Sequence, residues 1–76
     1  MNWQDRIAVD PQILVGKPNI RGTRIAVEFI VELYAAGWTE AQILQDYPHL
    51  TSDDLRAALT YASERLKSEK FSTLPA

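Results

Sequence analysis

The chain has 76 residues, no cysteine, one histidine and a net charge of −2, which excludes disulfides and thiolate metal sites and leaves too few ligands for a convincing zinc or iron site. A domain of this length buries only about 60–65% of the surface that its unfolded chain exposes, so we expect support from a second copy, as a homodimer. The sequence has no apolar run of about 18 residues and no leader pattern, so we expect a cytoplasmic protein that does not enter a membrane.

Charge divides the chain into three parts. Residues 1–24 carry a net charge of +2, residues 25–54 carry six acidic side chains with no Lys or Arg, and residues 55–76 again carry +2. Phosphate is attracted only by the basic parts. We therefore expect any contact with nucleic acid at the N-terminal arm or on the last helix.

The first 26 residues have the pattern of short strands separated by turns. Three apolar runs, at 7–9, 13–15 and 20–25, are bounded or interrupted by Pro and Gly, which is typical of two or three very short strands. Isolated short strands are unstable in water. We expect a second copy to supply the missing edge, so that residues 1–26 form a β-arm used in dimerisation.

Two amphipathic helices follow. Val27, Ile30, Val31 and Tyr34 recur at helical spacing until Gly37, which predicts a helix with an apolar face and a glycine C-terminal cap. Thr39, with a glutamine three residues later, predicts a capping box that opens a second, shorter helix ending at Pro48.

A third helix begins at Thr51 or Ser52, and its first turn holds Asp53 and Asp54, where the helix dipole favours negative charge. An apolar stripe predicts its buried side: Leu55, Ala58, Leu59, Ala62 and Leu66. Residues 27–67 thus predict a trihelical helix-turn-helix core of a mainly α protein. Residues 68–76 predict a flexible tail, whose Phe71 and Leu74 either have no role or become ordered on a partner protein.

The outer face of the third helix is the first candidate binding site. Cations and hydroxyls line it together at spacings of four and three: Arg56, Thr60, Ser63, Lys67 and Lys70. Such side chains suit phosphates and base edges, although a solvated helix face has the same composition. Asp53 and Asp54 count against DNA, because the N-terminal residues of a recognition helix contact the bases.

A second candidate site is the turn-rich segment that holds Lys17, Arg21 and Arg24. Its glycines permit a close backbone approach, so these cations could bind a phosphate or a carboxylate of a partner protein. Equally, they could form a charged edge that prevents strands from aggregating.

The sequence gives no indication of an enzyme. His49 is the one acid–base candidate, and it follows Pro48 in a turn. Asp53 and Asp54 are explained by the helix N-terminus. We expect no catalysis, no cofactor and no small-molecule substrate.

Several segments together resemble a known family. They are Ile13–Ile25 with its Gly-Lys-Pro and Arg-Gly-Thr-Arg elements, Ala36–Thr39, Ile43–Pro48 and Ala57–Ala62. The chain resembles the domain-of-unknown-function 433 family from about Asp5 to Leu66, a small bacterial antitoxin-like family grouped with VapB-like antitoxins. Gly16, Lys17, Pro18 and Arg21–Arg24 match its signature. Many members have proline where this chain has Ala26 and glycine where it has Val15.

The resemblance implies a homeodomain-like fold with an N-terminal β-arm. It also implies an antitoxin that neutralises a PIN-like ribonuclease toxin and, as a dimer, represses its own operon by binding operator DNA. The acidic centre of the chain supports a different function, a protein-interaction module that does not bind DNA.

Overall fold

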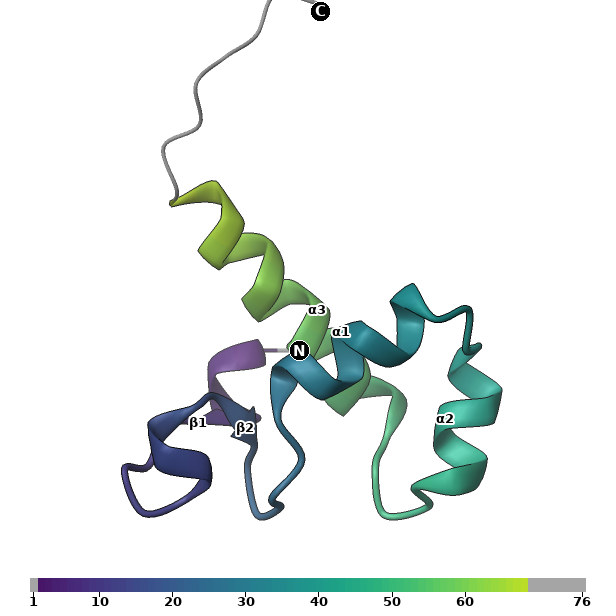
Figure 1. Cartoon of the computed structure of the whole chain (residues 1–76), viewed down its shortest axis with the longest axis horizontal. Coiled ribbons are helices and arrows are strands. Elements are labelled where there is room, and N and C mark those ends of the chain that lie inside the picture. The colour runs from purple at the N-terminus through teal and green to yellow at the C-terminus, as the bar shows by residue number, and fades with distance from the viewer. Residues whose placement is uncertain (1, 69–76) are drawn as a thin grey trace, which may run out of the picture.

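The computed structural model describes residues 2–68 and confirms a mainly helical fold with a short two-stranded antiparallel sheet near the N-terminus (Figure 1). Two short 3₁₀ helices alternate with two strands before three α-helices. The elements are η1 (Trp3–Asp5), β1 (Ile7–Ala8), η2 (Leu14–Gly16), β2 (Asn19–Ile20), α1 (Val27–Ala35), α2 (Glu40–Asp46) and α3 (Ser52–Lys67).

The two strands pair with each other. β1 lies antiparallel to β2, with Ile7 opposite Ile20, and an isolated bridge joins Asn19 to Ala26 on the other side of β2. Ile7 and Ile20 are both buried in the core. The chain therefore supplies a partner strand itself, so a second copy is not needed for strand pairing, and a role of the arm in dimerisation stays a prediction.

The run Ile13–Val15 was expected to be a strand, and this is also wrong. Asp10 starts a turn there by accepting a hydrogen bond from the Gln12 amide (2.9 Å), and the 3₁₀ helix η2 follows. Leu14, Val15 and Gly16 all have positive φ. Three left-handed residues in succession cannot form an extended strand, so apolar content alone misled the sequence prediction.

The helix ends agree with the sequence predictions. Thr39 and Thr51 each cap a helix with a reciprocal capping box, and the positive φ of Gly37 follows the end of α1. These local hydrogen bonds satisfy the first amides of α2 and α3. These capping residues fix the positions at which α2 and α3 begin.

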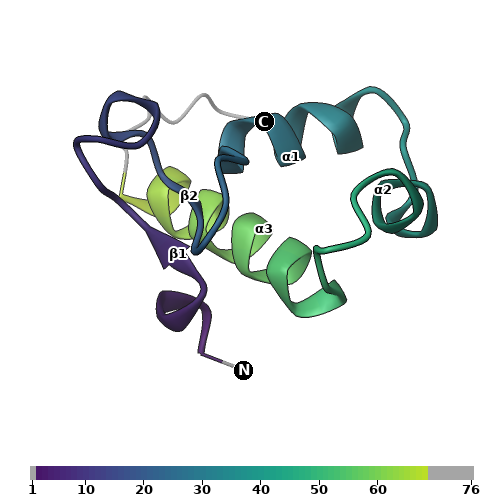
Figure 2. The ribbon, with the colours of Figure 1, turned by 90° about the horizontal axis from the view of Figure 1, so that it is seen from below.

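Helix α3 is the centre of the fold. Figure 2 shows α1 on one side of α3, with η1 and β1 on the other, and both sides contact it. Leu55, Ala57 and Ala58 are consequently fully buried. The predicted stripe is correct for Leu55 and Ala58, but it missed Ala57, which shares a helix face with Asp54 and Tyr61, the partners of Arg6 and Trp3.

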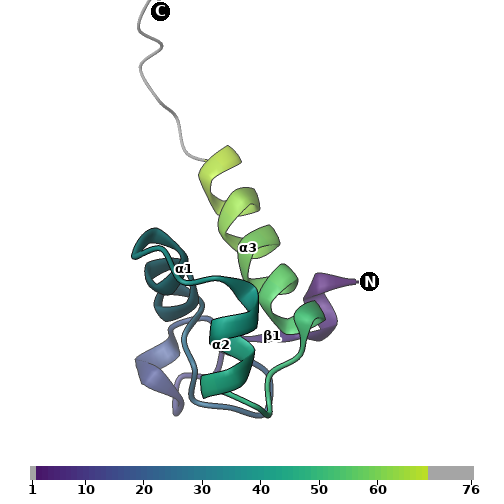
Figure 3. The same ribbon diagram turned by 90° about the vertical axis from the view of Figure 1, so that its right-hand side faces the viewer.

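The predicted stripe is wrong for its outer leucines. Leu59 is 41% exposed and Leu66 is 54% exposed. α3 has 16 residues and α1 has nine, so α1 does not cover the last turns of α3, where Leu66 lies, whereas Leu59 lies in the middle of α3 beside the buried Ala58. Figure 3 shows the last turns of α3 extending away from α2 and the N-terminal elements.

Candidate nucleic-acid interface

A polar pocket of about 550 Å³ lies at the N-terminal end of α3. It joins cations and carboxylates from the first residues of the chain, the turn after β2 and the first turns of α3. The lining residues are Asn2, Asp5, Arg6, Arg21, Asp53, Asp54 and Arg56. Two of the predicted DNA-binding residues, Arg21 and Arg56, are thus brought to one place.

Arg6 bridges the N-terminal segment and α3. Its guanidinium lies 3.0 Å from the carboxylate of Asp54 and 3.6 Å from that of Asp53. Asp54 also accepts a hydrogen bond from the Thr51 amide (3.0 Å), so the same carboxylate caps the helix. The negative charge at the start of α3, which counted against DNA binding, is therefore paired with a cation of the same chain.

Arg21 holds the backbone of the N-terminal segment. Its guanidinium donates to the carbonyls of Asp5 (2.9 Å) and Ile7 (2.9 Å), and more weakly to that of Gln4 (3.4 Å). Carbonyl groups at a helix end lack partners within the helix, and Arg21 supplies one here. Much of the donor capacity of this arginine is thus used inside the fold.

The outer face of α3 presents the other predicted residues to solvent. Arg56, Ser63 and Lys67 are exposed, and Thr60 is partly exposed. The Thr60 hydroxyl donates to the Arg56 carbonyl (2.8 Å), while Lys67 lies 3.6 Å from Glu64 in an exposed pair. Arg56 and Lys67 are the two cations of this face in the described part of the helix.

The structure separates Lys17 from Arg21. Lys17 lies beside α1, where its amino group forms an ion pair with Glu28 at 2.6 Å. The hydrogen bond with Glu28 raises the pKa of Lys17 above its ordinary value. Arg24 is exposed on the turn before α1 and lines neither the polar pocket nor the groove beside Lys17.

The sequence did not reveal the buried polar side chains that hold the turn between β2 and α1. Asn19 is fully buried, and its side-chain amide donates to the carbonyls of Ile20 (3.0 Å) and Thr23 (2.7 Å). The Thr23 hydroxyl donates to the Ile20 carbonyl (2.7 Å) and accepts from the Ile25 amide (3.0 Å). With Gly22 at positive φ, these bonds define the turn between β2 and α1.

Other sequence candidates are placed as follows. His49 is exposed in the turn between α2 and α3. In residues 2–68, no three His, Cys, Asp or Glu side chains gather as a metal site would require. Within the same range, no helix has the length and apolar character needed to span a bilayer. Phe71 and Leu74, the candidate partner-binding residues, and Lys70 lie outside the described residues.

The arrangement of these elements has relatives among known proteins. The family described as "Protein of unknown function (DUF433)" matches residues 7–62. The chain belongs to the DUF433 family. The matched residues include β1, β2, α1, α2 and most of α3.

Two DUF433 comparisons support the fold. The crystal structure of a DUF433 member from Anabaena variabilis superposes with a TM-score of 0.79 at 34% identity, covering 84% of this chain and 63% of that one. The uncharacterised protein y4eO of Sinorhizobium fredii is 36% identical over 56 residues, which is 74% of this chain and 25% of that protein. The chain therefore spans a quarter of one relative and under two thirds of the other.

The residues on which the sequence resemblance rests include several that make fold contacts. Arg21 binds carbonyls of the N-terminal segment, Gly22 adopts positive φ, and Thr23 closes the turn. These contacts explain why the sequence resemblance indicates the fold correctly.

Proposed function

We propose that this DUF433 protein binds DNA as a dimer, with α2 and α3 as a helix-turn-helix unit and α3 as the recognition helix. The arrangement supports this proposal because one side of α3 packs into the core through Leu55, Ala57 and Ala58. The opposite side of the helix is exposed to solvent. Arg56, Ser63 and Lys67 on that side supply donors for phosphates and base edges, and the Thr60 hydroxyl, which donates to the Arg56 carbonyl, can accept from a base amino group.

The observation that carries the proposal is the position of Arg6. Unpaired carboxylates at the start of a recognition helix would repel the DNA backbone. Arg6 forms ion pairs with both Asp53 and Asp54, so its single positive charge offsets about half of that repulsion. Arg56, one turn along the helix, brings a second cation next to this partly neutralised cluster, and Arg24 adds an exposed cation before α1.

The proposal is tested with labelled duplex DNA taken from upstream of the protein's own gene. Wild-type protein binds it in a fluorescence anisotropy titration at low salt, and Arg56→Glu with Lys67→Glu abolishes binding. Lys17→Gln serves as the control, because it removes one cation that lies away from the α3 face. If the variant with both charges reversed binds this DNA as tightly as wild-type protein does, α3 is not the recognition helix.

The family resemblance extends the proposal to an antitoxin that neutralises a PIN-like ribonuclease and represses its own operon. A feature of α2 supports a protein-binding role that does not require DNA. Glu40 and Asp46 are exposed on this short helix, and neither forms an ion pair within residues 2–68. Both could meet the basic RNA-binding surface of a nuclease.

The two roles predict different sensitive residues. Co-purification with a neighbouring PIN-like gene product, lost in a Glu40→Lys and Asp46→Lys variant but retained in the α3 variant, supports the antitoxin role. If neither helix variant alters inhibition of that ribonuclease, the acidic face is not its binding surface.

A further inference from the structure

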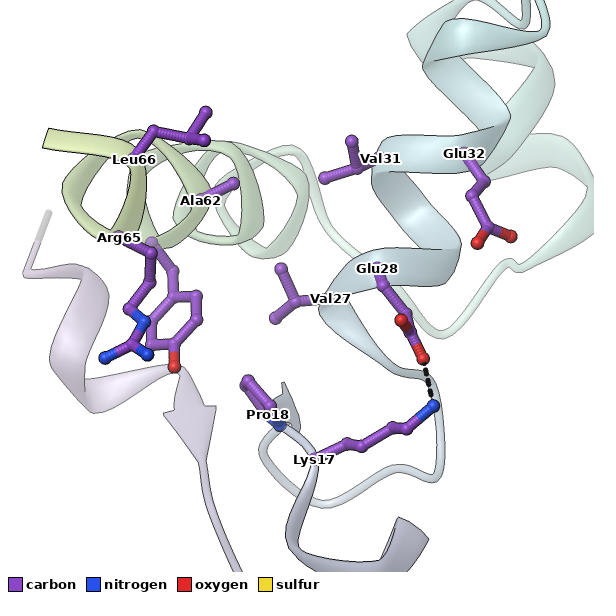
Figure 4. A pocket seen from close by; sticks show the side chains of 10 residues that line it. Lys17, Pro18, Val27, Glu28, Val31, Glu32, Ala62, Arg65 and Leu66 are labelled. Carbon is purple, nitrogen blue, oxygen red and sulfur yellow. Dashed lines mark hydrogen bonds and ion pairs between the residues drawn. The ribbon is translucent and has the colours of Figure 1, made fainter. Parts of the chain in front are cut away.

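An apolar groove of about 520 Å³ lies between α1 and the C-terminal half of α3. Figure 4 shows Val27 and Val31 on the α1 side and Ala62 and Leu66 on the α3 side. Tyr61 also lines the groove, and its ring packs edge-on against Trp3 at a centroid distance of 5.6 Å. The groove is thus built from packed side chains of two helices.

Leu66 marks the open side of this groove. Its side chain is 54% exposed and belongs to the last turns of α3, which extend beyond α1. Contiguous exposed apolar surface with a polar rim is typical of protein interfaces, and Leu66 extends the apolar lining of this groove to the surface. The same helix carries a second exposed leucine, Leu59, that does not line the groove.

The two sides of the groove carry charges of opposite sign. Glu28 and Glu32 border it on α1, and Arg65 borders it on α3 (Figure 4). Glu28 is paired with Lys17, but Glu32 and Arg65 form no ion pair within residues 2–68. An apolar strip between one acidic and one basic edge is complementary to itself.

We propose that a second copy of this chain docks on the α1–α3 groove in a two-fold arrangement. Leu66 of each copy enters the groove of the other, and each Arg65 pairs with Glu32 of the opposite copy. A two-fold interface uses the same patch twice, so the patch must contain both members of every pair. A partner that carries only positive or only negative charge would be repelled at one edge of the groove.

The inference rests on the proposed function in one respect, that a helix-turn-helix protein of this size acts as a dimer. It differs from the β-arm that the sequence suggested as dimer surface, since β1 and β2 already pair within one chain. The docked region also leaves the Arg56 end of α3 outside the interface, since Arg56 does not line the groove.

The first experiment measures the molar mass of the full chain by sedimentation velocity over a range of protein concentrations. Wild-type protein forms a dimer, and Leu66→Glu forms a monomer whose circular dichroism spectrum shows retained helix. Leu59→Glu changes an exposed leucine of the same helix and stays dimeric. A monomeric wild type, or a Leu66→Glu dimer, overturns the proposal and leaves the groove to another occupant.

The second experiment uses charge exchange. In Glu32→Arg homodimers, two arginines oppose each other at both contacts, and in Arg65→Glu homodimers two glutamates do so. Each variant alone therefore dimerises at least tenfold more weakly than wild type. Mixing the two variants restores a dimer, because every contact in the mixed dimer joins opposite charges. Two variants that remain unable to associate when mixed would contradict the pairing.

These outcomes are separate from those of the DNA titration. A wild-type dimer that is disrupted by Leu66→Glu but binds no DNA supports the groove and refutes the proposed function. DNA binding by a dimer that survives Leu66→Glu supports the proposed function and refutes the groove as the dimer surface.

Discussion

The guanidinium of Arg6 lies 3.0 Å from the carboxylate of Asp54, joining the N-terminal segment to the first turn of α3. The Asp54 side chain is only 13% exposed and also caps the helix through the Thr51 amide. One carboxylate thus supports both the start of α3 and the docking of the N-terminal segment. The charge of the arm and the stability of α3 are coupled through this contact.

Arg6→Ala is expected to lower the free energy of unfolding by about 1–2 kcal/mol, since it removes a charge-assisted hydrogen bond to a largely buried carboxylate. Chemical denaturation monitored by circular dichroism measures the loss. The matched control is Lys67→Ala, whose ion pair with Glu64 is well exposed and contributes at most about 0.5 kcal/mol. Equal effects of the two substitutions would contradict a special role for Arg6.

Val15→Gly is expected to stabilise the protein. Val15 has φ 56° and ψ 37° and is 93% exposed, so its side chain makes little contact while its backbone is left-handed. Relieving this conformation, offset by the greater chain entropy of glycine, gives a net gain of about 0.5–1 kcal/mol. The midpoint of thermal unfolding rises accordingly.

Val9→Gly provides the comparison for that prediction. Val9 is 60% exposed and does not have a positive φ, so glycine there only adds entropy to the unfolded chain. It is expected to lower stability by up to about 1 kcal/mol. Changes of the same sign at both positions would show that the left-handed backbone of Val15 carries no strain.

Asn19→Ala is expected to cost about 2–3 kcal/mol, because it removes two hydrogen bonds from a fully buried amide and leaves a small cavity. Asn19→Asp retains the volume but places a carboxylate oxygen against two carbonyls, so it costs at least as much. Urea denaturation measures both. A loss below about 0.5 kcal/mol for Asn19→Ala would show that these bonds add little to the turn.

The Lys17–Glu28 pair predicts a small stability change at high pH. The pair raises the pKa of Lys17 above 10.5, so its contribution is complete below that value and is lost as the pH rises through the folded-state pKa. Burial raises the pKa of Tyr34 above 10.0, which lowers stability over the same range.

A Tyr34→Phe background isolates the lysine effect. In it, the difference in melting temperature between the parent and its Glu28→Gln derivative should shrink between pH values of about 9 and 11.5. A difference that stays constant across this range would show that the ion pair does not contribute to folding.

Local signals in the sequence predicted the helices well. The capping boxes at Thr39 and Thr51, the glycine after α1 and the period of Val27 and Ile30 depend on neighbouring residues, and each is present in the structure. These features follow from backbone hydrogen bonding within one helix, which a sequence expresses directly.

The failures involve contacts between distant segments. Arg6 reaches Asp54 across 48 positions, and Arg21 reaches the Asp5 carbonyl across 16. Neither spacing follows a helical or strand period, so no local pattern could reveal it. The exposure of Leu66 depends likewise on the shorter length of α1, which limits how much of α3 can be covered.

The salt dependence of DNA affinity tests the central claim, that the outer face of α3 contacts the DNA backbone, most directly. The logarithm of the wild-type association constant should fall linearly with the logarithm of salt concentration, and Arg56→Ala with Lys67→Ala should reduce the slope by about 1.8, or about 0.9 for each lost phosphate contact. Lys17→Gln should leave the slope unchanged. Identical slopes for the wild type and the double variant would contradict the assignment of α3 as the recognition helix.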